Sequence, residues 1–267
     1  MMVPFQPAQF AIEHDRRAVR QLAESFQKLA GVKHTDLGPF TVAGESYFLP
    51  RLEFRGPNSA DPIRIGLFAV LHGDEPAGAL AALECLAQLA SRPELAESFL
   101  LHVYPLCNPT GFEDGTRLSR GGLDLNREFW RDSTAPEVRL LEHELRHGLF
   151  HGIIQFHADD TSAGLYGFVR GHTLTENLLR PALAVAERFL PRNLSSQIDG
   201  FAARDGIIYE QYEGILAAPA EMASVPFEIV LETPALAPLD RQVAALVMAT
   251  QTILSEYRKF IAFAQDI

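Results

Sequence analysis

The segment His72-Gly-Asp-Glu75 places an imidazole and a carboxylate three residues apart, a combination that can bind zinc. It follows the apolar run 63–71 and precedes Pro76-Ala-Gly-Ala-Leu-Ala-Ala-Leu, which has the composition of a helix start. A strand therefore delivers both side chains at its carboxyl end, the edge at which open α/β sheets bind ligands. Two ligands do not complete a zinc site, so we expect a third from elsewhere in the chain.

Three further apolar runs also end in polar residues. Run 100–106 is followed by Cys107 and Asn108, run 152–156 by His157, and run 227–231 by Glu232. The carboxyl ends of parallel strands meet at one edge of a sheet. We therefore expect the side chains at these four ends to converge on one site.

A second pairing of histidine with glutamate, His143-Glu-Leu-Arg-His147, matches the His-Glu-x-x-His pattern of zinc proteases. Its helix, however, gathers four apolar side chains within one arc of about 80°, those of Val138, Leu141, Leu145 and Leu149. Both histidines fall on the opposite side, where they face solvent. We therefore interpret this segment as an amphipathic surface helix, not as a metal site.

Strand-like and helix-like segments alternate along the chain. The expected strands are 63–71, 100–106, 152–156, 165–170, 206–210 and 227–231, with a hairpin over 41–54. The expected helices are 13–29, 77–89, 136–149, 175–190 and 238–263, and 108–129 is a long polar loop of the kind that is usually functional. This alternation predicts a single α/β/α domain, residues 1–267, around a mixed, largely parallel sheet. Residues 1–60 are expected to form a helix and hairpin region that packs on it.

Composition narrows the classes of partner. The net charge of −11 argues against nucleic acid, which requires a basic surface, and no apolar run approaches the length of a membrane span. We therefore expect neither a nucleic-acid nor a membrane partner. Two cysteines do not suggest a disulfide framework, and the N-terminal residues do not read as a secretory signal, so a cytoplasmic location is predicted.

The loop segment 115–130, with the sequence GTRLSRGGLDLNREFW, makes a family resemblance specific. Together with His72-x-x-Glu75, His157 and Leu231-Glu-Thr-Pro234, it resembles the zinc metallocarboxypeptidase family, the carboxypeptidase A-like enzymes, over about residues 63–245. The segment His72-Gly-Asp-Glu-Pro-Ala-Gly78 also resembles the related aspartoacylase and succinylglutamate desuccinylase branch. Both branches have an α/β/α fold around a mixed sheet, so the resemblance implies that fold.

The resemblance also implies roles around one zinc ion per chain. His72, Glu75 and His157 would bind the ion and leave one position for water. Glu232 would be the general base that takes a proton from this water and passes it to the leaving nitrogen. Asp124 would orient the imidazole of His72.

Polar side chains of the loop would bind the substrate. Asn126 and Arg127 match the residues that hold the substrate's terminal carboxylate, a task suited to a planar guanidinium. Arg117 matches the arginine that stabilises the developing oxyanion, with Arg120 as an alternative.

A tyrosine and a side-chain pocket complete the implied site. Tyr209 corresponds to the mobile tyrosine of the family, with Tyr212 as a competing candidate. The specificity pocket is expected near residues 216–220, whose small apolar side chains would disfavour basic C-terminal residues.

Two activities are compatible with this set of residues. The first is a zinc metallocarboxypeptidase that removes the C-terminal residue of a peptide, and the second is a zinc-dependent deacylase of N-acyl amino acids. Loop 108–129 and the Leu231-Glu-Thr-Pro234 segment favour the peptidase. Either substrate has a free carboxylate. A non-catalytic relative would be expected to lack a ligand or the base, and here all are present.

Overall fold

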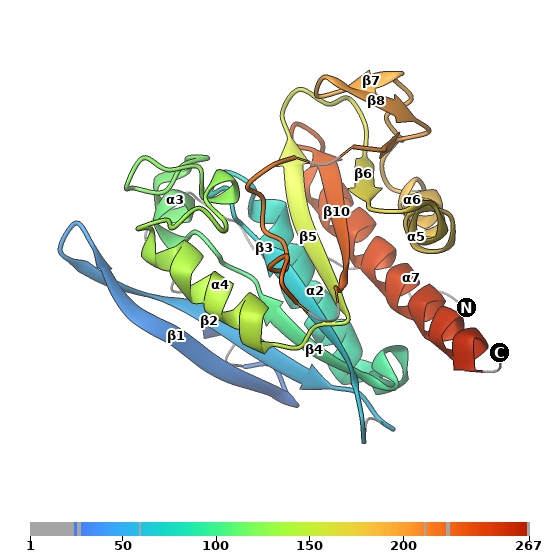
Figure 1. Ribbon diagram of the computed structural model, residues 1–267, viewed down its shortest axis with the longest axis horizontal. Coiled ribbons are helices and arrows are strands. Elements are labelled where there is room, and N and C mark those ends of the chain that lie inside the picture. The colour runs from blue at the N-terminus through green and yellow to red at the C-terminus, as the bar shows by residue number, and fades with distance from the viewer. Residues whose placement is uncertain (1–23, 26–27, 59, 211, 223–224, 266–267) are drawn as a thin grey trace.

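A mixed sheet of ten strands forms the centre of the protein, whose computed structural model describes residues 24–25, 28–58, 60–210, 212–222 and 225–265 (Figure 1). The order of the strands is β1-β2-β4-β3-β5-β10-β6-β9-β8-β7. The strands are β1 (Val32–Val42), β2 (Glu45–Arg55), β3 (Ile63–Ala69), β4 (Phe99–Tyr104), β5 (Gly152–Asp159), β6 (Tyr166–Val169), β7 (Gln197–Ile198), β8 (Phe201–Arg204), β9 (Ile207–Ile208) and β10 (Phe227–Pro234).

The parallel part of the sheet is its middle. Strands β4, β3, β5 and β10 run parallel to one another, as the alternation of strands and helices predicts. The β1–β2 hairpin adds antiparallel strands at one side, and β6 pairs antiparallel with β10 at the other. The predicted mixed sheet is confirmed, and its central strands present their carboxyl ends at one edge.

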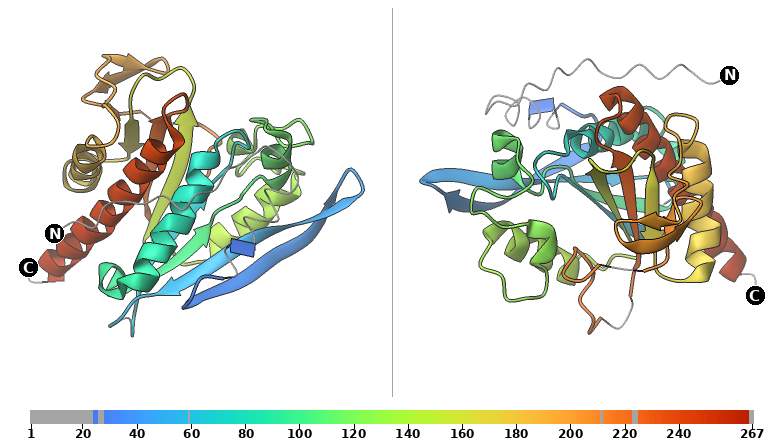
Figure 2. Two further views of the ribbon diagram at one scale, coloured as in Figure 1. Left: turned by 180° about the vertical axis from the view of Figure 1, so that it is seen from behind. Right: turned by 90° about the horizontal axis from the view of Figure 1, so that it is seen from above.

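Helices cover both faces of this sheet (Figure 2). They are α2 (Pro76–Ser91), α3 (Pro109–Asp114), α4 (Pro136–His147), α5 (His172–Leu174), α6 (Arg180–Ala186) and α7 (Leu239–Gln265), with single turns η1 (Pro93–Ala96), η2 (Leu125–Arg127) and η3 (Thr175–Leu179). Helix α7 packs between α2 and α6 on one face, and α4 packs on the other. The α/β/α architecture is therefore as predicted.

Apolar side chains fill the space between the layers, and the two largest clusters lie on opposite faces of the sheet. Leu67 and Ile154 point from the central strands into the core beneath α2 and α7, and both are almost fully buried. Their neighbours Phe68 and Ile153 point the other way, into the core beneath α4. This alternation is the side-chain period of a strand buried on both faces, which explains why these strands appear in the sequence as continuous apolar runs.

Departures from the expected elements are local. The hairpin turns at Ala43-Gly44 as predicted, but β1 begins at Val32. The expected helix 175–190 is α5, η3 and α6, and η3 is a π-helical turn. The β7–β8 hairpin was not predicted: β7 has only two residues and shows no alternating pattern, and the turn dipeptide Asp199-Gly200 was overlooked. The expected helix 13–29 lies mostly outside the described residues.

Among the described residues, no helix is both long and apolar enough to cross a membrane. Cys85 and Cys107 are free thiols, and both are buried.

Candidate metal centre and active site

A short connection between β3 and α2 places His72 and Glu75. Its first residue, Val70, has a φ of 55°, which is a strained conformation for a β-branched side chain and occurs typically at functional sites. Gly73 packs against the backbone of Gly111, and a Cβ there would lie 1.9 Å from the Gly111 carbonyl carbon. Only glycine fits at this position. Glu75 then occupies the N-cap of α2, immediately before Pro76.

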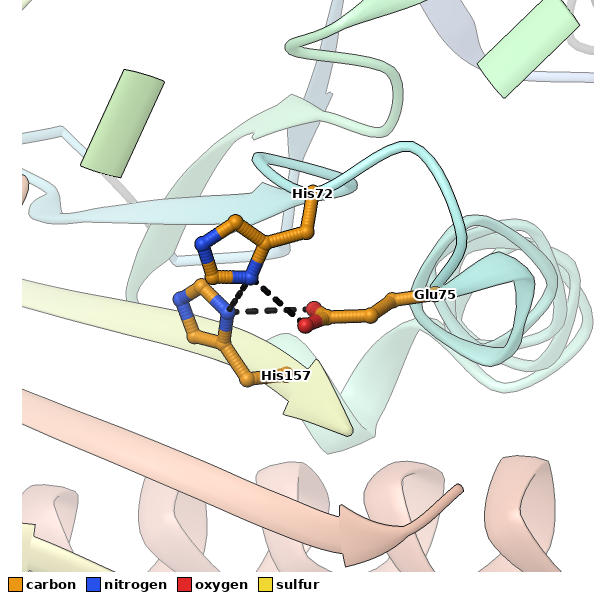
Figure 3. A group of neighbouring side chains, drawn as sticks. All are labelled: His72, Glu75 and His157. Carbon is orange, nitrogen blue, oxygen red and sulfur yellow. Dashed lines mark hydrogen bonds and ion pairs between the residues drawn. The ribbon is translucent and has the colours of Figure 1, made fainter. Parts of the chain in front are cut away.

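The three predicted metal ligands meet at the carboxyl edge of the sheet (Figure 3). The Nδ1 atom of His72 lies 2.6 Å from Glu75 Oε1, and that of His157 lies 3.1 Å from Glu75 Oε2. The two Nδ1 atoms are 3.3 Å apart. One ligand atom from each residue lies within 4.8 Å of the others, and all three side chains are buried. Two imidazoles and a carboxylate in this arrangement suit a metal ion with an open position for water, typically zinc.

The electrostatics of the cluster keep the carboxylate ionised. Burial alone would raise the pKa of Glu75, but the imidazoles of His157 and His72 outweigh burial and lower this pKa to about 2. Burial lowers the pKa of the His157 imidazole, so its neutral form is favoured. These two shifts favour the forms that bind a metal, which are the carboxylate and the neutral imidazole. At His72 the shift is opposite, because burial is outweighed by the charge of Glu75 and the hydrogen bond of Asp124, which raise the pKa of its imidazole.

Asp124 lies behind His72, as predicted. Its Oδ1 is 3.2 Å from His72 Nε2, and its Oδ2 accepts a hydrogen bond from Arg117 Nε at 3.1 Å. Burial opposes ionisation of Asp124, but the hydrogen bond and charge of His72 and the charge of Arg117 hold the pKa of this carboxyl below its usual range. A proton on Nε2 that is donated to Asp124 leaves the Nδ1 of His72 free for the metal.

The two candidate arginines are clearly separated in space. A cavity, called the central cavity below, is lined by the three candidate ligands His72, Glu75 and His157. Arg117 is about half exposed and lines this cavity, and its Nη1 lies 4.0 Å from Glu75 Oε1. Arg120 does not line the cavity, and its guanidinium pairs with Glu113 at 3.0 Å and Asp114 at 2.7 Å. The geometry therefore supports Arg117, and Arg120 instead ties its loop to α3.

Asn126 and Arg127 also line the cavity. Asn126 Oδ1 accepts a hydrogen bond from the Leu216 backbone N–H at 2.8 Å, and its Nδ2 lies 3.3 Å from His157 Nε2. The guanidinium of Arg127 stacks 5.4 Å from the centre of the Tyr212 ring and donates to the Asn126 carbonyl. Among the described residues, no carboxylate forms an ion pair with Arg127. Its charge is therefore available to a ligand.

Glu232 is on β10, level with His157 on the parallel neighbour β5. It lines the same cavity, which has a volume of about 330 Å³. Burial raises the pKa of Glu232 well above its ordinary value, and the nearby carboxylates of Glu75 and Asp159 raise it further. A protonatable carboxyl group thus faces the three metal ligands.

Tyr212, not Tyr209, lines the cavity. Tyr209 is 55% exposed and lies near Arg180, so the structure places Tyr212 at the cavity and not Tyr209. The Tyr212 hydroxyl donates to Asp199 Oδ2 at 2.7 Å.

The specificity pocket was expected near residues 216–220, but these residues do not line the central cavity. Leu216 is instead buried in the core beneath α4. The neighbouring Ile215 lines the cavity.

Several cavity residues were not predicted, namely Asp159, Asp160, Tyr166 and Asp199. Asp159 and Asp160 follow His157 at the same strand end, so their position in the sequence could have indicated them. Tyr166 reaches the site because β6 pairs with β10, which places it level with Glu232. Asp199 lies in the turn between β7 and β8, and the dipeptide Asp199-Gly200, typical of a tight hairpin turn, could have indicated it.

The His143-Glu-Leu-Arg-His147 segment is part of α4, and both histidines are exposed, as predicted. Its glutamate points inward, where Glu144 Oε2 accepts hydrogen bonds from Tyr104 at 2.6 Å and from Arg51 at 2.8 Å. The segment therefore has a structural role in packing α4 on the sheet.

Comparisons with known proteins agree with this geometry. Residues 62–203, more than half of the chain, match the family described as succinylglutamate desuccinylase/aspartoacylase catalytic domain. This range contains the three metal ligands and the 115–130 loop, and it ends before Glu232. No curated protein matches the chain significantly.

Solved structures resemble the whole domain. A crystal structure from Shewanella amazonensis SB2B, provisionally described as a metallopeptidase, is 25% identical and has a TM-score of 0.76, covering 91% of this chain and 93% of that chain. A metallo-carboxypeptidase from Burkholderia cenocepacia is 18% identical, with a TM-score of 0.68 and coverage of 91% and 69%. A metallo-carboxypeptidase from Pseudomonas aeruginosa, in complex with (2-guanidinoethylmercapto)succinic acid, is 18% identical, with a TM-score of 0.63 and coverage of 90% and 69%. The last two comparisons concern the fold alone.

The metal-ligand cluster, the fold and the family match lead to one assignment. The chain belongs to the succinylglutamate desuccinylase/aspartoacylase catalytic-domain family, and it is a metal-dependent hydrolase with the carboxypeptidase A-like fold.

Proposed function

We propose that this protein is a zinc-dependent metallocarboxypeptidase that hydrolyses the C-terminal peptide bond of its substrate, with Glu232 as the general base. The observation that carries the proposal is the placement of five side chains around one cavity. The cluster of His72, Glu75 and His157 lines it together with Glu232. Arg127, which forms no ion pair with a carboxylate among the described residues, lines it as well. A hydrolytic centre and a binding group for a terminal carboxylate therefore share one space.

Different side chains would bind the metal, transfer the proton and stabilise the oxyanion. A zinc ion held by the three ligands would provide Lewis acidity and lower the pKa of water toward about 7. Glu232 would accept a proton and deliver it to the leaving nitrogen, a task for which a carboxyl group with a raised pKa is suited. Arg117 would donate hydrogen bonds to the oxyanion that develops on the carbonyl.

Binding of the terminal carboxylate would select the bond that is cut. Arg127 can donate two parallel hydrogen bonds to a carboxylate, and Asn126 can add its amide. Tyr212, whose ring lies against the guanidinium of Arg127, would close this end of the cavity. A substrate held in this way presents the bond next to its terminal residue to Glu232.

The second candidate is a zinc-dependent deacylase of N-acyl amino acids, with the same ligands and base. The family match over residues 62–203 favours this alternative, since that family is described by succinylglutamate desuccinylase and aspartoacylase. An N-acyl amino acid also has a free carboxylate for Arg127. The resemblance of the whole domain to a metallopeptidase fold supports the peptidase.

Turnover by the zinc-loaded full-length protein separates the two candidates. We expect hydrolysis of a panel of peptides with free C-termini, at rates above those for N-acetylaspartate and N-succinylglutamate. Turnover of the acyl amino acids alone would reverse the order of the candidates. Turnover that is unaffected by removal of the metal with a chelator would contradict both.

The role of Glu232 is tested by Glu232→Gln. Loss of a general base is expected to lower kcat about 10²- to 10⁴-fold while the zinc content is unchanged. Glu228→Gln is the matched control, because Glu228 is on the same strand but accepts a hydrogen bond from the Ala218 N–H outside the cavity. Near-normal kcat for Glu232→Gln would refute its role as the base.

A further inference from the structure

Acidic side chains outnumber basic ones in the wall of the central cavity. Six carboxylate side chains line it but only two arginines, Arg117 and Arg127. Two of the carboxylates are occupied by tyrosine hydroxyl groups, since Tyr166 donates to Asp159 at 2.9 Å and Tyr212 donates to Asp199 at 2.7 Å. Arg117 is bound to Asp124, which leaves Arg127 as the arginine available for a substrate carboxylate. The site is therefore matched to a substrate with few negative charges.

A second cavity of about 280 Å³ is also lined by Glu75. It shares four wall residues with the central cavity, which are Asp74, Glu75, Ala158 and Ala235. The two cavities therefore adjoin at Glu75, and Arg127 lines only the first of them. A substrate whose carboxylate binds Arg127 and whose scissile carbonyl lies at the cluster would extend its acyl half toward the second space.

None of the described residues that line the second cavity has a cationic side chain. Its far side consists of Pro76, Ala237, Leu239 and the amide of Gln242, which already donates to the carbonyls of Ala235 and Ala237. Two helices begin at this wall, but they offer few free N–H groups to an anion. Pro76 has none, and Gln242 N donates to the Pro238 carbonyl.

Of the two carboxylates that line both cavities, Asp74 and Glu75, Asp74 is the one that is not a candidate metal ligand. Among the described residues its carboxylate forms no ion pair, and it lines both spaces one residue before the metal ligand Glu75. An acyl half that extends from the cluster into the second cavity would lie near this carboxylate, because Asp74 lines both spaces. A carboxylate on the acyl half would be repelled there, and an ammonium group would be attracted.

We infer that the second cavity binds the acyl half of the substrate, that it accepts a neutral or ammonium-bearing acyl half over a dicarboxylic one, and that Asp74 determines this preference. The inference rests on the proposed function, because it assumes that an amide bond is hydrolysed at the cluster. It specifies the substrate class as short peptides with a free amino group, or neutral N-acyl amino acids. Asp74 acts on specificity and takes no part in the chemistry.

Three substrates with a common leaving residue test this inference on the zinc-loaded full-length protein. They are the alanyl, acetyl and succinyl derivatives of the amino acid that is released fastest from the peptide panel. For the natural sequence, we expect kcat/KM to decrease in the order alanyl, acetyl, succinyl. Because exposed charges interact weakly in water, Asp74→Asn is expected to reduce the alanyl-to-succinyl ratio about threefold to fivefold.

Charge reversal sharpens the test. Asp74→Lys is expected to reduce the alanyl-to-succinyl ratio of kcat/KM by about tenfold or more, and a high salt concentration should weaken this reduction. Asp240→Lys is the matched control, because Asp240 is exposed in the first turn of α7 and does not line the second cavity. The control is expected to leave the ratio unchanged. Zinc content is measured for every variant, so that a loss of metal is not mistaken for a change of specificity.

The outcomes distinguish this inference from the function on which it rests. Chelator-sensitive turnover with a preference for the succinyl derivative, or with a ratio that both Asp74 variants leave unchanged, would overturn the inference and leave metal-dependent hydrolysis intact. No turnover of any amide substrate by the zinc-loaded protein would overturn the proposed function and the inference together.

Discussion

The chain contains two pairings of histidine with glutamate, and the structure gives them opposite surroundings. His72 and Glu75 lie between β3 and α2, buried, with His157 brought beside them from β5. His143 and His147 lie on the outer side of α4, exposed, and Glu144 between them points into the protein. The second segment matches the better-known zinc-protease pattern, yet the first forms the cluster of potential metal ligands.

The difference shows that residue type and spacing are not sufficient for a metal site. A site also needs an element that directs the side chains into a common space, and a third ligand that reaches the same space. Strand ends at the carboxyl edge of a parallel sheet meet both requirements, because neighbouring strands contribute there. The outer side of an amphipathic helix meets neither, because its neighbour is solvent.

Removal of one histidine from each region gives the largest expected contrast. His157→Ala is expected to lose bound zinc and to lower turnover by more than about 100-fold, since both the ligand set and the activated water are lost. His147→Ala should retain zinc and activity. Metal analysis and hydrolysis rates measure both. Zinc retained at full stoichiometry in His157→Ala, or lost in His147→Ala, would break the comparison.

A smaller effect is expected from the residue that supports the buried pair. Asp124→Asn keeps the size of the side chain but removes the charge that faces His72 Nε2. Zinc affinity should fall about 10- to 100-fold, as is usual when the partner of a metal-bound histidine is lost. Competition with a chelator measures this affinity. Asp61→Asn, at an exposed position before β3, serves as the control and should have unaltered affinity.

The smallest expected effect concerns the stability of the helix region. Glu144→Gln weakens the hydrogen bonds to Tyr104 and Arg51 and should lower the free energy of unfolding by about 1–3 kcal/mol. Unfolding in urea measures this change, and zinc affinity should be unaltered. His143→Gln, on the exposed side of the same helix, should change stability by less than about 0.5 kcal/mol. A change of zinc affinity in Glu144→Gln would contradict the structural role of this segment.

Much of the fold and of the ligand set could be predicted from the sequence. The apolar runs that became β3, β4, β5 and β10 were recognisable because central parallel strands are buried on both faces. His72, Glu75, His157 and Glu232 were predicted together because each follows or ends such a run. The geometry also supports the carboxylate partner of His72, since Asp124 lies beside it. The cytoplasmic location stays a prediction.

Other features depended on contacts between distant segments. Tyr209 and Tyr212 are three residues apart, and only the packing of their loop against Arg127 shows which one lines the cavity. Arg117 and Arg120 are likewise three residues apart. Arg117 lies beside Glu75, whereas Arg120 forms ion pairs with Glu113 and Asp114. These choices rest on loops without a periodic pattern, so local sequence does not predict them.

The sequence by itself therefore determined which side chains stand at the carboxyl ends of the central strands, because buried strands and helix starts are encoded by local composition. Only the tertiary structure decided what these side chains face. It brought Tyr166 level with Glu232, joined Asp199 to Tyr212, and formed a second cavity beside Asp74. The physical reason is that strand register and loop packing arise from contacts between residues far apart in the chain, which short-range patterns do not contain.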